Sequence, residues 1–93
     1  MKEREQLWKL IYDLTDNKID IKAFCKDFTR IFDLEIDYDE LSEEEEKAFD
    51  KLSTITARFS AFEEDFIKYP KVYFSEHDVR AEVKKILLQF QQN

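Results

Sequence analysis

The segment Ile21-Lys-Ala-Phe-Cys-Lys-Asp-Phe-Thr-Arg-Ile-Phe32 decides the fold class of this chain. Its apolar side chains fall at offsets 0, 3, 4, 7, 10 and 11 from Ile21, the spacing that places residues on one face of an α-helix. Asp20 lies directly before the segment and carries a short carboxylate of the kind preferred at an N-cap. The segment therefore predicts an amphipathic helix that begins after Asp20 and ends near Phe32.

Helical spacing recurs along most of the chain. It predicts three further helices, over residues 3–16, 43–60 and 75–90. Boundary signals stand at their ends: Asn17 as a stop, and the capping boxes Ser42 with Glu45 and Ser75 with Asp78. Residues 1–93 are thus expected to form a single all-α domain, a compact antiparallel four-helix bundle with longer second and third connections.

The two longer connections are less regular in sequence. The acidic alternation of residues 33–41 fits a loop, a helical turn or a short extended piece, and we predict a loop. Residues 61–74 contain the only proline, Pro70, which prevents a simple continuation of the helix before it. We expect some of its phenylalanines (Phe62, Phe66, Phe74) to close the core, and its tyrosines (Tyr69, Tyr73) to be exposed.

Composition excludes several classes of protein. The 93 residues include no glycine and carry a formal net charge of −7. Without glycine, Gly-rich phosphate-binding loops are excluded. The acidic balance repels nucleic acid and anionic membranes, so a charge-driven partner should be basic. Aromatic residues make up 15% of the chain, too many for an acidic disordered tail.

The chain has the sequence features of a cytoplasmic protein. Its one cysteine, Cys25, cannot form an intrachain disulfide, which fits a reducing compartment. Residues 1–6 are rich in charge where a signal peptide needs an apolar stretch. We therefore expect a cytoplasmic location and no membrane partner.

Few residues are suited to catalysis or metal binding. His77 is the only histidine and lies between two acids at the start of the last predicted helix, where a surface or capping role is expected. Cys25 falls on the apolar stripe of its helix and is expected to be a buried structural thiol. The sequence leaves the distance between these two residues open. We predict that the chain is not an enzyme and binds no cofactor, metal or small-molecule substrate.

The negative charge is concentrated in one window, residues 33–50, which holds ten acids and one base, whereas the rest of the chain has a net charge of +2. Helix-dipole chemistry alone could explain the acids of residues 43–46, which occupy a helix N-terminus. The Lys22, Lys26 and Arg30 stripe could also lie beside the acids. Neither explains residues 33–40, where acids alternate with Leu34, Ile36 and Tyr38.

A solvated acidic loop and a partner-binding surface remain the two interpretations of this window. Acids with apolar anchors among them suit an interface with a basic protein, because the acids speed encounter and the anchors supply desolvated contact. On this hypothesis the partner-binding residues are Asp37, Tyr38, Asp39, Glu40, Glu43 and Glu44. A second acidic and aromatic cluster, residues 62–74, adds Tyr69 and Tyr73 to the candidates.

Several pieces of the chain resemble, in order, the immunity proteins of the colicin D type. They are Lys18-Ile19 with Ile21 and Phe24, the pair Arg58-Phe59, and the closing segment Tyr73-Phe-Ser-Glu-His-Asp-Val-Arg-Ala-Glu-Val-Lys-Lys-Ile-Leu-Leu-Gln-Phe90. Members of that family are small acidic helical proteins that neutralise a co-encoded tRNA-cleaving toxin domain. Contact-dependent growth-inhibition systems use immunity proteins of the same general kind.

The resemblance implies a stoichiometric inhibitor that covers the basic active-site cleft of a ribonuclease, with carboxylates in place of tRNA phosphates. It also implies that the acids after Arg58-Phe59, namely Glu63, Glu64 and Asp65, make contacts. The family's acidic residue before that pair is Ala57 here, so the acidic window at residues 33–50 is a second candidate surface.

The function predicted from the sequence is therefore a cytoplasmic immunity protein in a 1:1 complex with a basic nuclease toxin, without direct binding of nucleic acid. The alternatives are a small helical adaptor or homodimer without a toxin partner, and a DNA mimic that acts on a DNA-binding protein.

Overall fold

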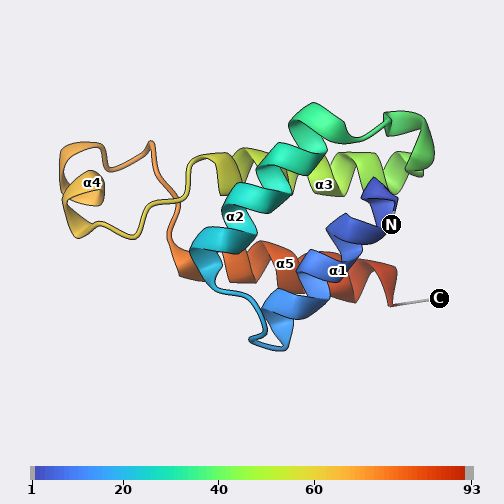
Figure 1. Ribbon diagram of the computed structural model, residues 1–93. Helices are drawn as coiled ribbons and strands as arrows, with labels where there is room; N and C mark the ends of the chain where they lie inside the picture. The colour runs from blue at the N-terminus through green and yellow to red at the C-terminus, as the bar shows by residue number, and fades with distance from the viewer. Residues whose placement is uncertain (1, 92–93) are drawn as a thin grey trace.

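Helices are the only regular elements in the computed structural model, which describes residues 2–91 (Figure 1). The five α-helices are α1 (Glu3–Thr15), α2 (Ile21–Arg30), α3 (Glu43–Ala57), α4 (Glu63–Lys68) and α5 (Glu76–Phe90). A π-helix, η1 (Ile31–Glu35), directly continues α2, and a short 3-10 helix, η2 (Tyr38–Glu40), precedes α3. The predicted all-α class is confirmed.

The helix boundaries follow the local chemistry of the sequence. Asp20 accepts a hydrogen bond from the backbone N of Lys22 and caps α2. Both predicted capping boxes are present, Ser42 with Glu45 at α3 and Ser75 with Asp78 at α5. After α1, Asn17 takes a φ of 58°, the left-handed conformation that asparagine tolerates better than most residues and that ends a helix without glycine.

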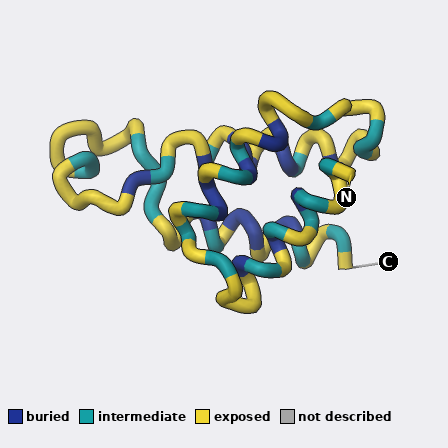
Figure 2. The backbone as a smooth tube through the Cα atoms, viewed as in Figure 1, coloured by how far each residue is buried: buried dark blue, intermediate teal, exposed yellow. Residues whose placement is uncertain are grey.

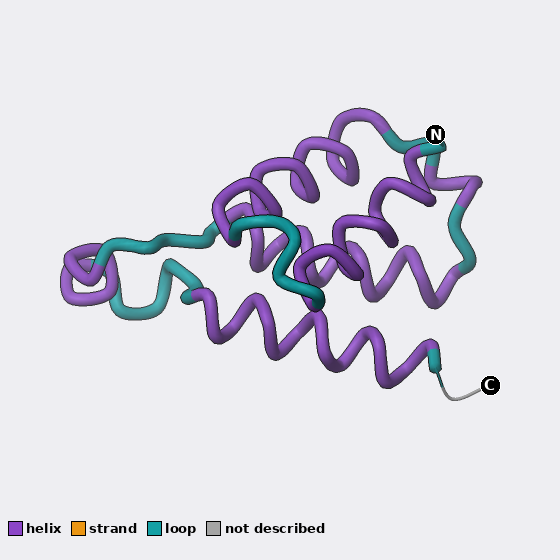
Figure 3. Tube along the Cα trace, turned by 60° about the horizontal axis from the view of Figure 1, so that its bottom comes forward, coloured by secondary structure: helices purple, strands orange, loops and turns teal. Residues whose placement is uncertain are grey.

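The four longer α-helices surround one hydrophobic core. α2 packs against α1 and α3, and α5 also packs against α1 and α3. Buried residues occur on each of these helices, as the dark blue stretches of the tube in Figure 2 show. The buried apolar residues of the core include Leu7, Ile11, Leu14, Phe24, Phe28, Phe49, Leu52, Val79, Val83 and Ile86. Helix α4 contributes no buried residue. It stands to one side of the other helices in both views (Figures 1 and 3).

The fold has five α-helices where the sequence predicted four. The missed helix, α4, is only six residues long, too short to show an apolar period. Its acids Glu63, Glu64 and Asp65 stand in the first turn and Lys68 in the last, the distribution that the helix dipole favours. That charge pattern is the signal that could have located it.

Helix α3 ends at Ala57, three residues before the predicted end at Ser60. The backbone N of Phe74 donates to the carbonyl of Arg58 at 2.8 Å, and the backbone N of Ser60 donates to the carbonyl of Phe74 at 3.0 Å. These bonds join Phe59 and Phe74 in an isolated β-bridge. The pairing with a distant segment takes residues 58–60 out of the helix.

The prediction of a loop from Asp33 is wrong, because the helix continues as η1 to Glu35. The backbone N of Ile36 donates to the carbonyl of Ile31 at 2.9 Å, the wider turn of a π-helix. Ile31 and Phe32, at the start of η1, are both buried. Burial of these two neighbours keeps the chain helical past the point where the α-helical spacing stops.

The expected closure of the core by residues 61–74 is also wrong. Phe62 is 66% exposed, and neither Phe66 nor Phe74 belongs to the apolar residues packed against the core. Phe59 packs there instead. The segment that connects α3 to α5 therefore extends away from the core. The longest dimension of the molecule is 39 Å, and the other two are 26 and 23 Å.

Candidate functional site

An acidic groove lies where the start of α3 meets η1 and η2. It has a volume of about 460 Å³ and is lined by Phe32, Tyr38, Glu43, Glu46, Lys47 and Asp50. We call this set the acidic groove. The three acids fall on one face of α3 because their positions differ by three and four residues. The Phe32 and Tyr38 rings pack together with their centroids 5.2 Å apart, which gives the groove an aromatic wall.

Most acids of the predicted window are not paired with a base. Of the ten acids in residues 33–50, only Glu35 and Glu45 form an ion pair with a base in the described chain, Glu35 with Arg30 and Glu45 with Arg4. The other acids of residues 33–50 have none, and they include every acid of the groove. Of the stripe predicted to offset the window, Arg30 does so by its 2.9 Å contact to Glu35, whereas Lys22 and Lys26 make no ion pair in the described chain.

Of the residues predicted in this window, Tyr38 and Glu43 line the groove, whereas Asp37, Asp39, Glu40 and Glu44 do not. The Tyr38 hydroxyl donates to the carbonyl of Phe32 at 3.0 Å, and its side chain remains 42% exposed. Asp37 caps η2 by accepting from the backbone N of Asp39. Asp39 and Glu44 are exposed, and Glu40 is half-buried.

A second surface is formed by residues 61–73, which we call the arm. It leaves the body of the molecule at the Phe59–Phe74 bridge and carries α4 (Figures 1 and 3). Much of its apolar surface faces solvent: Phe62 is 66% exposed, Ile67 72%, Tyr69 52% and Val72 42%. Exposed apolar side chains gathered on one segment mark interaction surfaces more often than single ones do.

The residues of the arm that the sequence predicted as partner contacts differ in whether they already have a partner within the chain. Glu63 and Glu64 are exposed and have no ion-pair partner in the described chain. Asp65 instead accepts a hydrogen bond from the Ser60 hydroxyl, which in turn accepts from the backbone N of Phe62. Tyr73 is half-buried and packs edge-on against the exposed Tyr69, with 6.1 Å between ring centroids. Asp65 therefore holds the arm together, and Glu63 and Glu64 are available to a partner.

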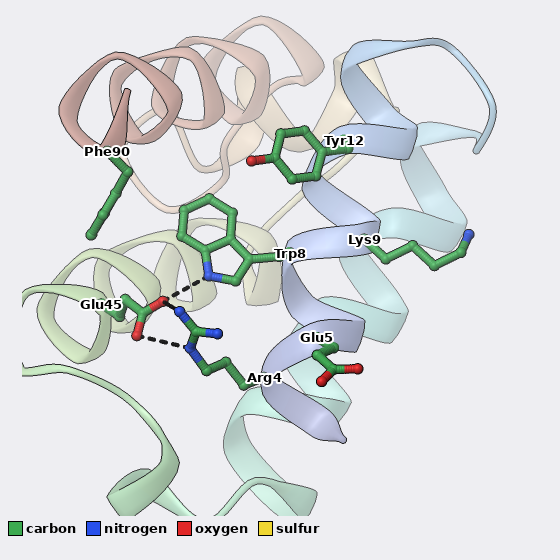
Figure 4. Close-up of a pocket in the computed structure, with 7 residues that line it drawn as sticks. All are labelled: Arg4, Glu5, Trp8, Lys9, Tyr12, Glu45 and Phe90. Atoms are coloured by element: carbon green, nitrogen blue, oxygen red, sulfur yellow. Dashed lines mark hydrogen bonds and ion pairs between the residues drawn. The ribbon is translucent and has the colours of Figure 1, made fainter. Parts of the chain in front are cut away.

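One acid of the window, Glu45, has a role that the sequence did not reveal. It is 4% exposed, and Figure 4 shows its carboxylate facing Arg4 and Trp8 of α1. Arg4 contacts the two carboxylate oxygens at 3.1 and 2.8 Å, and the Trp8 indole N–H donates at 2.7 Å. The backbone N of Ser42 donates at 2.9 Å. We call these groups the Glu45 clamp, which joins α1 to the start of α3.

Hydrogen bonds decide the charge state of this buried carboxylate. Burial raises the pKa of Glu45, but the hydrogen bonds from Arg4, Ser42 and Trp8 lower it further than burial raises it, so the pKa lies below its ordinary value of 4.5. The clamp also borders a groove of about 630 Å³ between α1, α3 and α5, with Trp8, Tyr12 and Phe90 among its walls (Figure 4). Glu45 neutralises Arg4 and Asp13 neutralises Lys9, which leaves Glu5 as the lining charge without an ion pair in the described chain.

Cys25 is buried, as the sequence predicts. It is 4% exposed, and desolvation together with Asp20 and Glu76 raises the pKa of its thiol to about 12. His77 is exposed at the start of α5. Since the thiolate is the nucleophilic form, Cys25 is a poor nucleophile at neutral pH in the folded protein.

We expect an aromatic disulfide reagent at about pH 8 to label Cys25 at least roughly a hundredfold more slowly in native protein than in denatured protein. The cause is the low thiolate fraction together with burial. Absorbance of the released thiol, followed with and without guanidinium, measures both rates. Rapid labelling of the native protein would contradict the buried position of Cys25.

Comparisons of the chain with protein-family models, curated proteins and solved structures find no match. Within residues 2–91, no helix has the length and apolarity needed to cross a membrane. The same residues contain no group of three or more His, Cys, Asp or Glu side chains arranged to hold a metal ion.

Proposed function

We propose that this chain is an immunity protein of the colicin D type, a cytoplasmic inhibitor that binds a basic nuclease toxin domain in a 1:1 complex. In this proposal the four longer helices act as an antiparallel bundle that presents an acidic surface, and that surface covers the toxin's active site in place of RNA. No catalytic step, cofactor or metal is involved. The observation that carries the proposal is the acidic groove, whose carboxylates form no ion pair in the described chain.

Unpaired carboxylates favour binding because no internal ion pair has to break first. Glu43, Glu46 and Asp50 face solvent, so a partner's lysine or arginine can replace water at each of them. Because all three carboxylates are negatively charged, they raise the local concentration of a basic partner and speed its association. The Tyr38 ring, held by its hydroxyl to Phe32, adds apolar contact without a large loss of side-chain freedom.

The arm supports the same function as a second contact. Its shape is held at the base by the Phe59–Phe74 bridge and internally by the bond between Ser60 and Asp65. A projecting segment of this kind can enter a concave surface, and preorganisation lowers the entropy lost on binding. Phe62 and Ile67 would supply apolar anchors there, with Glu63 and Glu64 beside them.

Charge reversal of the groove tests the proposal with the nuclease domain that the proposal expects to be encoded beside this gene. Glu46→Lys with Asp50→Lys should weaken binding by roughly a hundredfold or more, because like charges across an interface cost several kcal/mol. The matched control, Glu5→Lys with Asp16→Lys, changes net charge equally on exposed residues of α1 and the turn after it and should change affinity less than about threefold. Affinity is measured by biolayer interferometry, and protection by survival of cells that express the toxin.

Two further experiments test the contribution of the arm and the role of charge in binding. Glu63→Lys with Glu64→Lys tests the arm, and Asp65 is left intact because it bonds Ser60. For the wild type, the association rate should fall steeply as salt rises. If neither double reversal weakens binding, or if no basic nuclease is encoded nearby and none is captured from the native strain, the proposal is wrong. Binding that depends on Phe62 and Ile67 alone would instead favour the small helical adaptor.

A further inference from the structure

A second groove, rimmed by bases, lies on the same surface as the acidic groove. It has a volume of about 460 Å³, with Lys22, Lys26 and Arg30 of α2 on its rim and Thr56, Ala57 and Phe59 among its other lining residues. We call it the basic-rimmed groove. An acidic protein with a net charge of −7 thus carries a local positive site.

The two grooves belong to one seam, the outer line of contact between α2–η1 and α3. Two hydrogen bonds cross the seam: Thr29 with Thr56 at 2.7 Å, and Ser53 with Asp33 at 2.8 Å. Residue numbers rise on one side as they fall on the other, so the two segments are antiparallel. Glu46 and Ala57, which line opposite grooves, are eleven residues apart on α3, or roughly 16 Å at 1.5 Å per residue.

The charges at the two ends of the seam are opposite in sign. At the acidic end, Glu43, Glu46 and Asp50 outnumber Lys47, which leaves a net charge of −2. At the other end Arg30 is balanced by Glu35 and Asp27. Lys22 and Lys26 make no ion pair within the described chain, although Lys22 lies over the Phe62 ring at 5.8 Å. With Arg30 and its two acids counted, the net charge at this end is +1.

The seam also carries the most exposed large apolar side chain described. Leu34 is 81% exposed and borders the basic-rimmed groove. It follows Asp33, whose bond to Ser53 lies between the two grooves. An apolar residue between charged ends is the arrangement expected near the centre of an interface, with charges toward the rim.

We propose that this seam is the interface of a homodimer. A second copy, related by a two-fold axis near Leu34, would place its basic-rimmed groove over the acidic groove of the first, and the reverse. A two-fold interface needs a self-complementary surface, since a contact from residue i to residue j is repeated from j to i. The seam has that property because both signs of charge lie on it.

The net charge of each copy does not prevent this association. At about 0.15 M salt, exposed charges more than roughly 8 Å apart are largely screened. The opposite charges brought together across the seam would lie closer than that distance and would be partly shielded from water, so they are screened less. The inference does not rest on the proposed function, but the two are linked: the dimer occupies the acidic groove, and a basic partner would therefore compete with it.

A complementary charge swap tests the dimer without any partner. Lys22→Glu with Lys26→Glu makes both ends of the seam acidic, and Glu46→Lys with Asp50→Lys makes both ends basic. Sedimentation equilibrium at about 0.15 M salt should find the wild type dimeric and each variant monomeric, with self-association weakened roughly a hundredfold. An equimolar mixture of the two variants should form a heterodimer, because both of its groove contacts then join opposite charges.

Controls keep a failure to fold apart from a failure to associate. All four substituted residues are exposed, and circular dichroism should give the same helicity for every variant. The matched control, Lys18→Glu with Lys84→Glu, reverses two exposed lysines outside the two grooves and should remain dimeric. A wild type that stays monomeric at high concentration, a dimer that survives both swaps, or a mixture that stays monomeric would each overturn the proposal.

Discussion

Replacing Phe49 by alanine should lower the free energy of unfolding by about 3–5 kcal/mol. Phe49 is fully buried on α3 and packs edge-on against Trp8 and Phe28, with ring centroids 5.1 and 5.7 Å apart. These contacts join α3 to α1 and α2. Alanine removes the transfer free energy of the ring and leaves a cavity that the three helices cannot fully close. Urea unfolding followed by circular dichroism measures the change, with the slope of the transition checked for constancy.

Leu88→Ala is the control for this experiment. Leu88 lies on α5 and is 52% exposed, so its truncation should cost less than about 0.5 kcal/mol. Phe49→Leu should fall between the two, since leucine keeps part of the apolar volume. A loss below about 1 kcal/mol for Phe49→Ala would mean that the ring is not a central core contact. A domain of this length has roughly 5–14 kcal/mol of stability, so Phe49→Leu serves as the measurable variant if Phe49→Ala removes most of it.

Replacing Glu45 by glutamine should lower the free energy of unfolding by about 2–3 kcal/mol. Glutamine keeps the volume but removes the charge that Arg4, Trp8 and the backbone N of Ser42 all contact. The loss should stay below that of a fully buried pair because Arg4 is 46% exposed and water can solvate it. Thermal unfolding should show a fall in midpoint of roughly 10–20 °C for this chain length.

Glu44→Gln is a close control for the Glu45 clamp. Glu44 is the neighbouring residue in the same helical turn, is exposed and has no ion pair in the described chain. Its substitution should change stability by less than about 0.5 kcal/mol. Equal effects at the two positions would show that helix-dipole interactions, rather than the clamp, account for the role of these acids.

The contribution of Glu45 should depend on pH. Its pKa is below 4.5 in the folded state, whereas the unfolded chain titrates near that ordinary value. Above about pH 4.5 both states have the carboxylate charged, and its stabilising effect is complete. As pH falls through the lowered pKa, the unfolded state gains a proton first and stability is lost. The difference between wild type and Glu45→Gln should therefore shrink in acid, and a constant difference would contradict a lowered pKa.

Substitutions in the core and on the surface of this protein should affect different properties, stability in the first case and association in the second. Phe49 and the Glu45 clamp hold the helices together, whereas the residues proposed to meet a partner or a second copy lie on exposed faces. Substitutions at Glu46, Asp50, Lys22 and Lys26 should therefore change association with little change in the unfolding midpoint of the monomer, measured at a protein concentration too low for a dimer. This separation is what makes the binding proposals testable in folded protein.

Local sequence patterns predicted most of the helices correctly. The N-cap at Asp20, the stop at Asn17 and both capping boxes depend on groups within one helical turn, so neighbouring residues suffice to place them. The apolar spacing of residues 21–32 likewise marked the face of α2 that became buried. Short elements such as α4 were missed because six residues contain too little periodicity.

The candidate functional surfaces were less predictable, because they depend on contacts between distant residues. The sequence placed ten acids in one window, but it could not separate Glu45, which pairs with Arg4 41 residues away, from Glu46, which faces solvent. It could not show that residues 61–73 leave the core as an arm, or that Lys22 and Lys26 share a seam with Glu46 and Asp50. Charge and helical spacing are properties of neighbouring residues, whereas burial and pairing arise only when the helices pack.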